Sequence, residues 1–88
     1  MKLVFSDEAW EDYLYWAASN EKIRDRINEL IKQCKRTPFK GVGKPEALKG
    51  DLSGWCSRRI SQEDRMVYRV SGSGDNQCLE IAQLRFHY

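Results

Sequence analysis

The sequence predicts an α+β fold in which two N-terminal helices pack on one face of a four-stranded, mainly antiparallel sheet, in the order β-α-α-β-β-β. Two segments in the first half have apolar residues at helical spacing, and three segments in the second half have strand character. A short apolar run precedes the first helix. With 88 residues, the chain is expected to form a single domain over 1–88. Two helices cover one face of the sheet, so we expect polar groups on the other.

Residues 2–5 are the short apolar run, and we expect them to form a strand. Ser6 follows as a capping hydroxyl, with Asp7 and Glu8 placed at the positive end of the helix dipole. The expected buried face has the spacing i, i+3, i+4 and i+7, which corresponds to Trp10, Tyr13, Leu14 and Ala17. Since the first strand has no strand neighbour in sequence, we expect it beside one of the later strands.

The second helix is the clearest periodic signal in the chain. Asn20 can cap it, and Pro38 requires it to end by Thr37, because the residue before a proline is disfavoured in helical conformation. Its apolar stripe comprises Ile23, Ile27, Leu30, Ile31 and Cys34. Residues 39–54 contain several glycines and lysines and are predicted to be irregular.

Three strands are predicted at residues 55–60, 65–70 and 78–86, joined by turn-forming segments at 61–64 and 71–76. The simplest arrangement is an antiparallel meander. Alternation in the middle strand places Met66, Tyr68 and Val70 on one face, which we expect to face the helices. Whether Arg58 or Arg59 shares a face with Arg65 depends on a hairpin register that the sequence does not fix.

Composition restricts the class of protein. Hydrophobic residues make up 41 % and charged residues 32 % of the chain, as in globular proteins, and no apolar run approaches the roughly 20 residues that cross a bilayer. The N-terminus lacks the apolar stretch of a secretory signal, so the cytoplasm is the expected compartment. The odd number of cysteines, three, and the single histidine favour reduced core cysteines over a disulfide framework or a zinc site.

The net charge is only +2, but acidic residues gather in the first 30 positions and basic residues dominate the rest. This asymmetry favours a phosphate-rich partner, although ordinary solvated side chains explain it equally well. The basic residues of the later part are Lys32, Lys35, Arg36, Lys40, Lys44, Lys49, Arg58, Arg59, Arg65, Arg69 and Arg85.

Cleavage of an RNA phosphodiester without a metal requires a base, an acid and cations that stabilise the phosphorane. Glu46 can be the base, although a surface glutamate balancing nearby lysines is the simpler interpretation. Arg65 can bind a phosphate through two oxygens, and Arg59 and Lys49 are secondary cations that can equally be solvent-facing.

The acid candidate is His87, the only histidine, and Tyr88 can position a base or assist proton transfer. Both residues can instead simply end a strand or pack against the sheet. No phosphate-binding glycine loop, zinc-protease motif or nucleophile elbow is present. If the protein catalyses a reaction, the absence of these motifs favours one that uses neither a metal nor a cofactor; otherwise the protein is not an enzyme.

The chain resembles the YoeB-type toxins of the RelE/ParE superfamily, which belong to bacterial toxin–antitoxin pairs. The similarity extends over nearly the whole length. It is carried by Trp10 with residues 12–16, by residues 27–31 and 36–39, by Gly41, residues 43–46, Leu48 and Lys49, by residues 52–54, 57–60 and 65–68, and by His87 and Tyr88. The resemblance implies a RelE-like toxin domain.

The resemblance also implies an activity and its residues. Members are ribosome-dependent endoribonucleases that cut mRNA in the decoding site, leaving a 2′,3′-cyclic phosphate and a 5′-hydroxyl. By matching position, Glu46 is the general base, His87 the general acid and Arg65 the transition-state stabiliser. Further matching active-site positions are Lys49, Arg59 and Tyr88. The implied partners are the ribosome, mRNA, an inhibitory antitoxin and often a second copy of the toxin.

Two departures lie beside the implied catalytic positions: Asp64 occupies a position that is usually histidine, and Phe86 one that is often tyrosine. Two other functions remain open. A non-enzymatic ParE-like protein would inhibit a protein target such as gyrase, but it would not need Glu46, Arg65 and His87 together. A general RNA-binding module would bind naked RNA with strong salt dependence, which a net charge of +2 does not favour.

Overall fold

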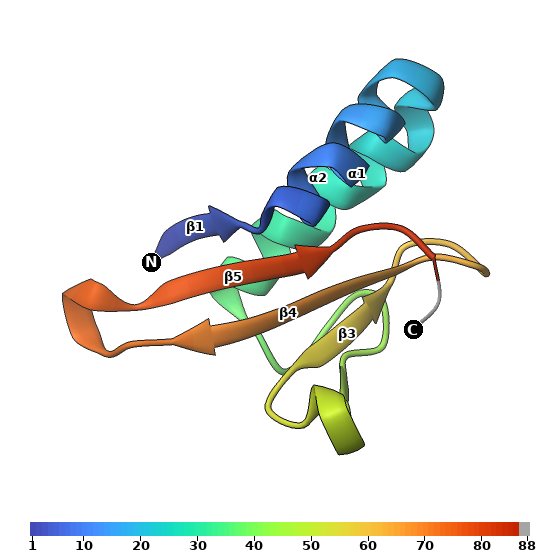
Figure 1. The fold of residues 1–88 in the computed structure, drawn as a ribbon. Coiled ribbons are helices and arrows are strands. Elements are labelled where there is room, and N and C mark those ends of the chain that lie inside the picture. Colours follow the sequence, from blue (N-terminus) through green and yellow to red (C-terminus); the bar gives the residue numbers. More distant parts are fainter. Residues whose placement is uncertain (87–88) are drawn as a thin grey trace.

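The computed structural model describes residues 1–86 as two helices over one mixed sheet of five strands (Figure 1). The helices are α1 (Asp7–Ser19) and α2 (Glu21–Arg36). The strands are β1 (Lys2–Phe5), β2 (Glu46–Ala47), β3 (Cys56–Arg59), β4 (Arg65–Ser71) and β5 (Cys78–Gln83). Single 3-10 turns occupy Gly50–Leu52 and Gly74–Asn76.

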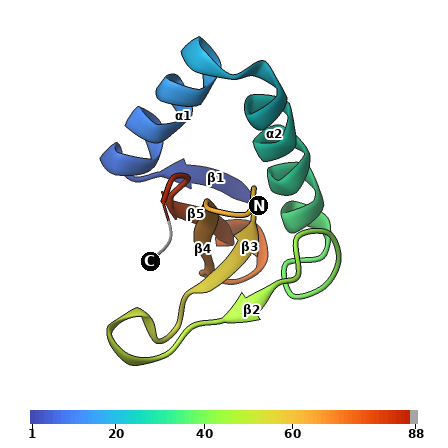
Figure 2. The same cartoon turned by 90° about the vertical axis from the view of Figure 1, so that its right-hand side faces the viewer.

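The sheet has the order β1-β5-β4-β3-β2. Strand β1 runs parallel to β5, whereas the other three pairings are antiparallel, so the predicted mainly antiparallel sheet and the pairing of the first strand with a later one are confirmed. Both helices lie on the same side of the sheet (Figures 1 and 2). The opposite face is therefore not covered by either helix.

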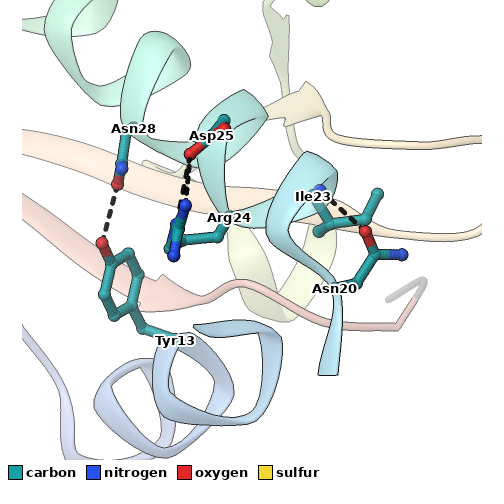
Figure 3. Close-up of polar contacts among 6 residues, drawn as sticks. All are labelled: Tyr13, Asn20, Ile23, Arg24, Asp25 and Asn28. Atoms are coloured by element: carbon teal, nitrogen blue, oxygen red, sulfur yellow. Dashed lines mark hydrogen bonds and ion pairs between the residues drawn. The ribbon is translucent and has the colours of Figure 1, made fainter. Parts of the chain in front are cut away.

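Side chains of the predicted residues, Ser6 and Asn20, cap the N-termini of the two helices. The Ser6 hydroxyl accepts the N–H of Ala9, and the Asn20 side-chain oxygen accepts the N–H of Ile23 at 3.2 Å. The hydroxyl of Tyr13 on α1 donates to the side-chain oxygen of Asn28 on α2 at 2.8 Å, which ties the helices together (Figure 3). The same view shows the exposed ion pair of neighbouring residues Arg24 and Asp25.

The core forms between α2 and the middle strands. Residues Ile27, Leu30, Ile31 and Cys34 of the predicted stripe are buried, and Ile23 is partly buried against them. From the sheet, Met66 and Tyr68 are fully buried and Val70 packs against the same cluster, as alternation predicts. The cluster is completed by Leu79 and Ile81 of β5, together with Ala9, Ile60 and Leu84.

The predicted buried face of α1 is wrong in part. Trp10 and Leu14 are 50 % and 43 % exposed, whereas Ala9 is fully buried and Trp16 packs against the core. Trp10 instead stacks on Tyr13 at the surface, with ring centroids 6.1 Å apart. The face that meets the sheet thus contains Ala9, Tyr13 and Trp16, which keep helical spacing but begin one residue earlier.

The sheet has five strands, one more than predicted. Two residues of the segment expected to be irregular, Glu46 and Ala47, form β2 against Ser57 and Cys56. The pairing continues on the C-terminal side, where Leu48 N–H donates to the Trp55 carbonyl at 2.9 Å. A two-residue strand is too short to produce an alternating pattern, so periodicity could not predict it.

Arg58 is fully buried on the helix side of the sheet. Its Nη1 donates to the Val42 carbonyl at 3.1 Å, and its Nη2 donates to the carbonyls of Lys40, at 2.8 Å, and Thr37. Its Nε approaches the Tyr68 hydroxyl at 3.4 Å. Within residues 1–86 no carboxylate pairs with this guanidinium, so backbone oxygens of the segment after α2 satisfy it.

We expect Arg58→Met to lower the free energy of unfolding by roughly 1–3 kcal/mol, because the Val42 carbonyl is left without a donor. The carbonyls of Thr37 and Lys40 keep only long local hydrogen bonds, from Lys40 N–H at 3.4 Å and from the Thr37 hydroxyl at 3.3 Å. The adjacent Arg59→Met is the matched control, since the Arg59 side chain is exposed, and should change stability by less than about 0.5 kcal/mol. Urea unfolding measures both. Equal effects of the two substitutions would contradict the structural role of Arg58.

Stability should also fall in alkali. Burial raises the pKa of the Tyr68 hydroxyl to about 12, outweighing the opposing effect of Arg58. The unfolded chain therefore releases this proton near pH 10 while the folded chain retains it, so stability decreases as the pH rises from about 10 to about 12, by roughly 2–3 kcal/mol. Urea titrations across this range should show a shallower slope for Tyr68→Phe. In Tyr68→Phe the free energy of unfolding should still fall somewhat with pH, because burial also raises the pKa of Cys34 and Cys56. An equal dependence on pH in the parent and in Tyr68→Phe would refute the assignment.

Candidate active site

The sheet face turned away from the helices carries Arg59 and Arg65. In the β3–β4 pairing Arg59 is directly opposite Arg65, whereas Arg58 is opposite Met66 on the core side. Directly opposite residues of an antiparallel pair point to the same face. The register therefore answers the question left open by the sequence: Arg59, not Arg58, joins Arg65.

Glu46 lies on this same face. Strand β2 places it directly opposite Ser57, and Ser57 shares a face with Arg59 because the two are separated by one residue of β3. Glu46 is thus a diagonal neighbour of Arg59, with a typical Cα separation of about 7–8 Å for such a pair. Three of the residues predicted for the site are brought together by sheet register alone: Glu46, Arg59 and Arg65.

The segment before Glu46 is held against β3 at Gly43. The Gly43 carbonyl accepts the N–H of Arg59 at 2.7 Å, and Gly43 has a φ of +86°, which favours glycine. A side chain at this position would also place its Cβ 3.1 Å from the Arg59 carbonyl oxygen and from a methyl group of Leu30. Together with the Arg58 contacts, this close approach fixes the path of the chain into β2 and leaves the Glu46 side chain exposed.

The guanidinium of Arg65 is bound by its own turn. Its Nη1 donates to the carbonyls of Ser61, Asp64 and Gln62 at 2.8, 3.1 and 3.3 Å. Within residues 1–86, Nη1 is the donor of every hydrogen bond that this side chain makes. The guanidinium is thus held in place while its Nε and Nη2 make no hydrogen bond within the described chain.

Lys49 is not brought to this row by the register. It is exposed and lies just before the 3-10 turn Gly50–Leu52, past the end of β2. The predicted residues His87 and Tyr88 lie outside the described residues. The structure therefore places Glu46, Arg59 and Arg65 on one face, and Lys49 in the loop that follows β2.

The last described residues approach the site from β5, which ends at Gln83 rather than at the predicted residue 86. The chain leaves the sheet because α1 binds the next residue: Leu84 N–H donates to the Asp12 carboxylate at 3.0 Å, and the Trp16 indole donates to the Leu84 carbonyl at 2.8 Å. Two residues on, the Arg65 N–H donates to the Phe86 carbonyl at 3.1 Å. The described chain thus ends beside the start of β4.

The sequence analysis gave no role to Ser57, left Arg58 open as an alternative to Arg59, and noted Asp64 only as a departure from the family. Ser57 is 2 % exposed and stands between Glu46 and Val67 in the cross-strand row. Arg58 could have been placed by alternation, since Cys56, Arg58 and Ile60 share the core face once Cys56 and Ile60 are assigned to the core. No sequence pattern indicates the contacts of Asp64, which join residues far apart in the chain.

The arrangement can accept a proton and stabilise an anion. An exposed carboxylate and two arginines share the sheet face that neither helix covers, a combination suited to a phosphate ester whose neighbouring hydroxyl must be deprotonated. Among residues 1–86, no three His, Cys, Asp or Glu side chains are grouped as a metal site. No helix in this part of the chain is long and apolar enough to cross a membrane.

Comparison with known proteins agrees with the fold. The curated toxin YoeB of Escherichia coli K12 is 53 % identical over 88 residues, covering 100 % of both chains. The structure of a YoeB/ParE toxin from Agrobacterium tumefaciens superposes with a TM-score of 0.96 at 56 % identity, again covering 100 % of both chains.

Two structures from Staphylococcus aureus extend the comparison, each covering 100 % of this chain and 98 % of the other. The heterotetrameric YoeB-YefM toxin–antitoxin complex contains a chain with a TM-score of 0.87 at 43 % identity, and the YoeB dimer gives 0.86 at 40 %. Residues 5–88 match the family described as the YoeB-like toxin of bacterial type II toxin–antitoxin systems. Sequence, fold and full-length similarity agree, and the chain belongs to this family of YoeB-like toxins.

Proposed function

We propose that this toxin is a ribosome-dependent endoribonuclease that cuts mRNA in the ribosomal A site and so stops translation. The observation that carries the proposal is the placement of Glu46, Arg59 and Arg65 on one open sheet face, with the described chain ending beside Arg65. A carboxylate held among cations is what attack on a phosphodiester requires, and a protein acting only by binding would not need it.

In the proposed reaction, the Glu46 carboxylate takes the proton of the 2′-hydroxyl as the 2′-oxygen attacks phosphorus. The bond between phosphorus and the 5′-oxygen breaks, and His87 gives its proton to the departing 5′-oxygen. The products are a 2′,3′-cyclic phosphate and a 5′-hydroxyl, and no metal or cofactor takes part. Arg65 stabilises the charge of the phosphorane, supported by Arg59, Lys49 and Tyr88.

The proposed partners follow from the reaction and from the relatives. The substrate complex is the ribosome with its mRNA, which places the protein in the cytoplasm. Because the Staphylococcus aureus relatives form a YoeB-YefM complex and a YoeB dimer, we propose that a cognate antitoxin and a second copy of this chain are also partners. Residues 1–88 act as one RelE-like toxin domain in this proposal.

The acid–base assignment is tested with purified protein, translating ribosomes and a defined mRNA. Glu46→Gln and His87→Gln should lower the single-turnover rate of A-site cleavage by about 10²-fold or more, because each removes one proton transfer. Co-sedimentation with ribosomes should be unchanged. Glu63→Gln is the control, since Glu63 is an exposed carboxylate of the turn before β4, and its cleavage rate should equal that of the parent.

Two outcomes would contradict this assignment. Full cleavage by both Glu46→Gln and His87→Gln would remove the proposed base and acid. Arrest of translation with every transcript intact would instead favour the non-enzymatic ParE-like inhibitor. Mapping of the transcript ends and measurement of protein synthesis in the same reactions distinguish these cases.

Removal of residues 86–88 provides an independent prediction. The truncated chain keeps the contacts of Leu84 to Asp12 and Trp16, so its melting temperature should fall only slightly, whereas cleavage should be lost with His87. Thermal unfolding and the cleavage assay measure the two effects. An active truncated protein would show that the C-terminus does not take part in the reaction.

A further inference from the structure

Asp64 joins the turn before β4 to the C-terminal segment. Its Oδ1 accepts the backbone N–H of Phe86 at 2.7 Å, and its Oδ2 accepts the Ser61 hydroxyl at 2.9 Å. The Ser61 hydroxyl oxygen in turn accepts the Asp64 N–H at 3.1 Å, so the carboxylate is oriented by the turn that carries it. The contact with Phe86 spans 22 positions of the sequence.

The same turn holds the side chain of Arg65. The Asp64 carbonyl accepts a hydrogen bond from Arg65 Nη1 at 3.1 Å, alongside the bonds of Nη1 to Ser61 and Gln62. One four-residue turn, 61–64, therefore binds the proposed phosphate-binding guanidinium through its carbonyls and the C-terminal segment through its carboxylate. The relative position of these two groups depends on this turn.

The backbone of Phe86 requires such support. Its φ is +68°, in the left-handed region that a residue with a Cβ rarely adopts. Its ring is not the anchor, because Phe86 is 62 % exposed. Both of its backbone polar atoms are bound instead: the N–H by the Asp64 carboxylate and the carbonyl by the Arg65 N–H, at 2.7 and 3.1 Å. These two hydrogen bonds form a clamp that holds Phe86 in the left-handed conformation.

We propose that Asp64 is a positioning residue, which holds the C-terminal segment beside Arg65 and so sets the place from which the next residue, the proposed acid His87, acts. This inference rests on the proposed function. It assigns Asp64 no contact with RNA and no proton transfer. Because Leu84 keeps its separate contacts with Asp12 and Trp16, loss of the clamp frees the chain only after β5 and leaves the core intact.

The test compares Asp64→Ala with Asp64→Asn, with Glu63→Ala as the neighbouring control. Asp64→Ala should lower the single-turnover cleavage rate by about 10²-fold, as expected for a misplaced catalytic group, without changing ribosome affinity. Asp64→Asn keeps an oxygen that accepts the Phe86 N–H and should retain the rate within about threefold. Glu63→Ala should match the parent, and all melting temperatures should be similar.

A second measurement does not depend on activity. Hydrogen exchange of the Phe86 amide, followed by NMR, should be at least about tenfold faster in Asp64→Ala than in the parent and should be slow again in Asp64→Asn. Ser61→Ala removes the hydroxyl that donates to the carboxylate and accepts the N–H groups of Glu63 and Asp64, but it leaves the carboxylate itself in place. It should therefore produce a smaller change in both exchange and cleavage. It also serves as the test variant if Asp64→Ala does not fold.

Two results would overturn the inference. If the Phe86 amide exchanges at the same rate in the parent, Asp64→Ala and Ser61→Ala, there is no clamp. If exchange of this amide becomes faster in Asp64→Ala while the cleavage rate is unchanged, the clamp does not position a catalytic group. If the parent protein itself does not cleave mRNA, the proposed function fails and the catalytic role of Asp64 fails with it. In that case the exchange data still decide whether Asp64 holds the C-terminal segment.

Discussion

The structure depends on the buried guanidinium of Arg58, which binds backbone carbonyls of the segment that leaves α2. A buried cation is costly unless its donors are satisfied, and here the acceptors are the main chain of a segment rich in glycine and lysine. That segment has few apolar side chains with which to hold itself to the core. The hydrogen bonds of one arginine therefore fix its path and, with the close approach of Gly43 to β3, determine where β2 begins.

The candidate site is assembled from segments far apart in the sequence, on the sheet face that the helices leave open. Glu46 arrives through β2, Arg59 and Arg65 through the β3–β4 pair, and the C-terminal segment through the turn at Asp64. Cross-strand pairing fixes the first three positions to one face, because the alternation of a strand permits no intermediate orientation. The helices contribute the core that supports this sheet and, through α1, the anchor at which the chain leaves β5.

The sequence predicts those parts of the fold in which a pattern repeats. The stripe of α2 and the alternation of Met66, Tyr68 and Val70 extend over several turns or residue pairs and are confirmed. The face of α1 was mispredicted because helical spacing fits a stripe that begins at Trp10 as well as one that begins at Ala9. In the structure Trp10 packs on a neighbouring ring at the surface, and the small Ala9 is buried. For the site, residue types indicated Glu46 and Arg65, but the choice of Arg59 over Arg58 and the contacts of Asp64 depend on register and on long-range hydrogen bonds, which no local pattern encodes.

In the proposed function, the sheet face opposite the helices presents Glu46 and Arg65 together to an RNA phosphate. The most direct measurement is a structure of the protein on a ribosome whose A-site codon carries a 2′-O-methyl group, which prevents cleavage. We expect a Glu46 carboxylate oxygen to lie beside the methylated 2′-oxygen, or one water from it, and Arg65 to contact a non-bridging oxygen of the following phosphate. A complex in which the helices face the mRNA and this sheet face is turned toward solvent would contradict the proposed function.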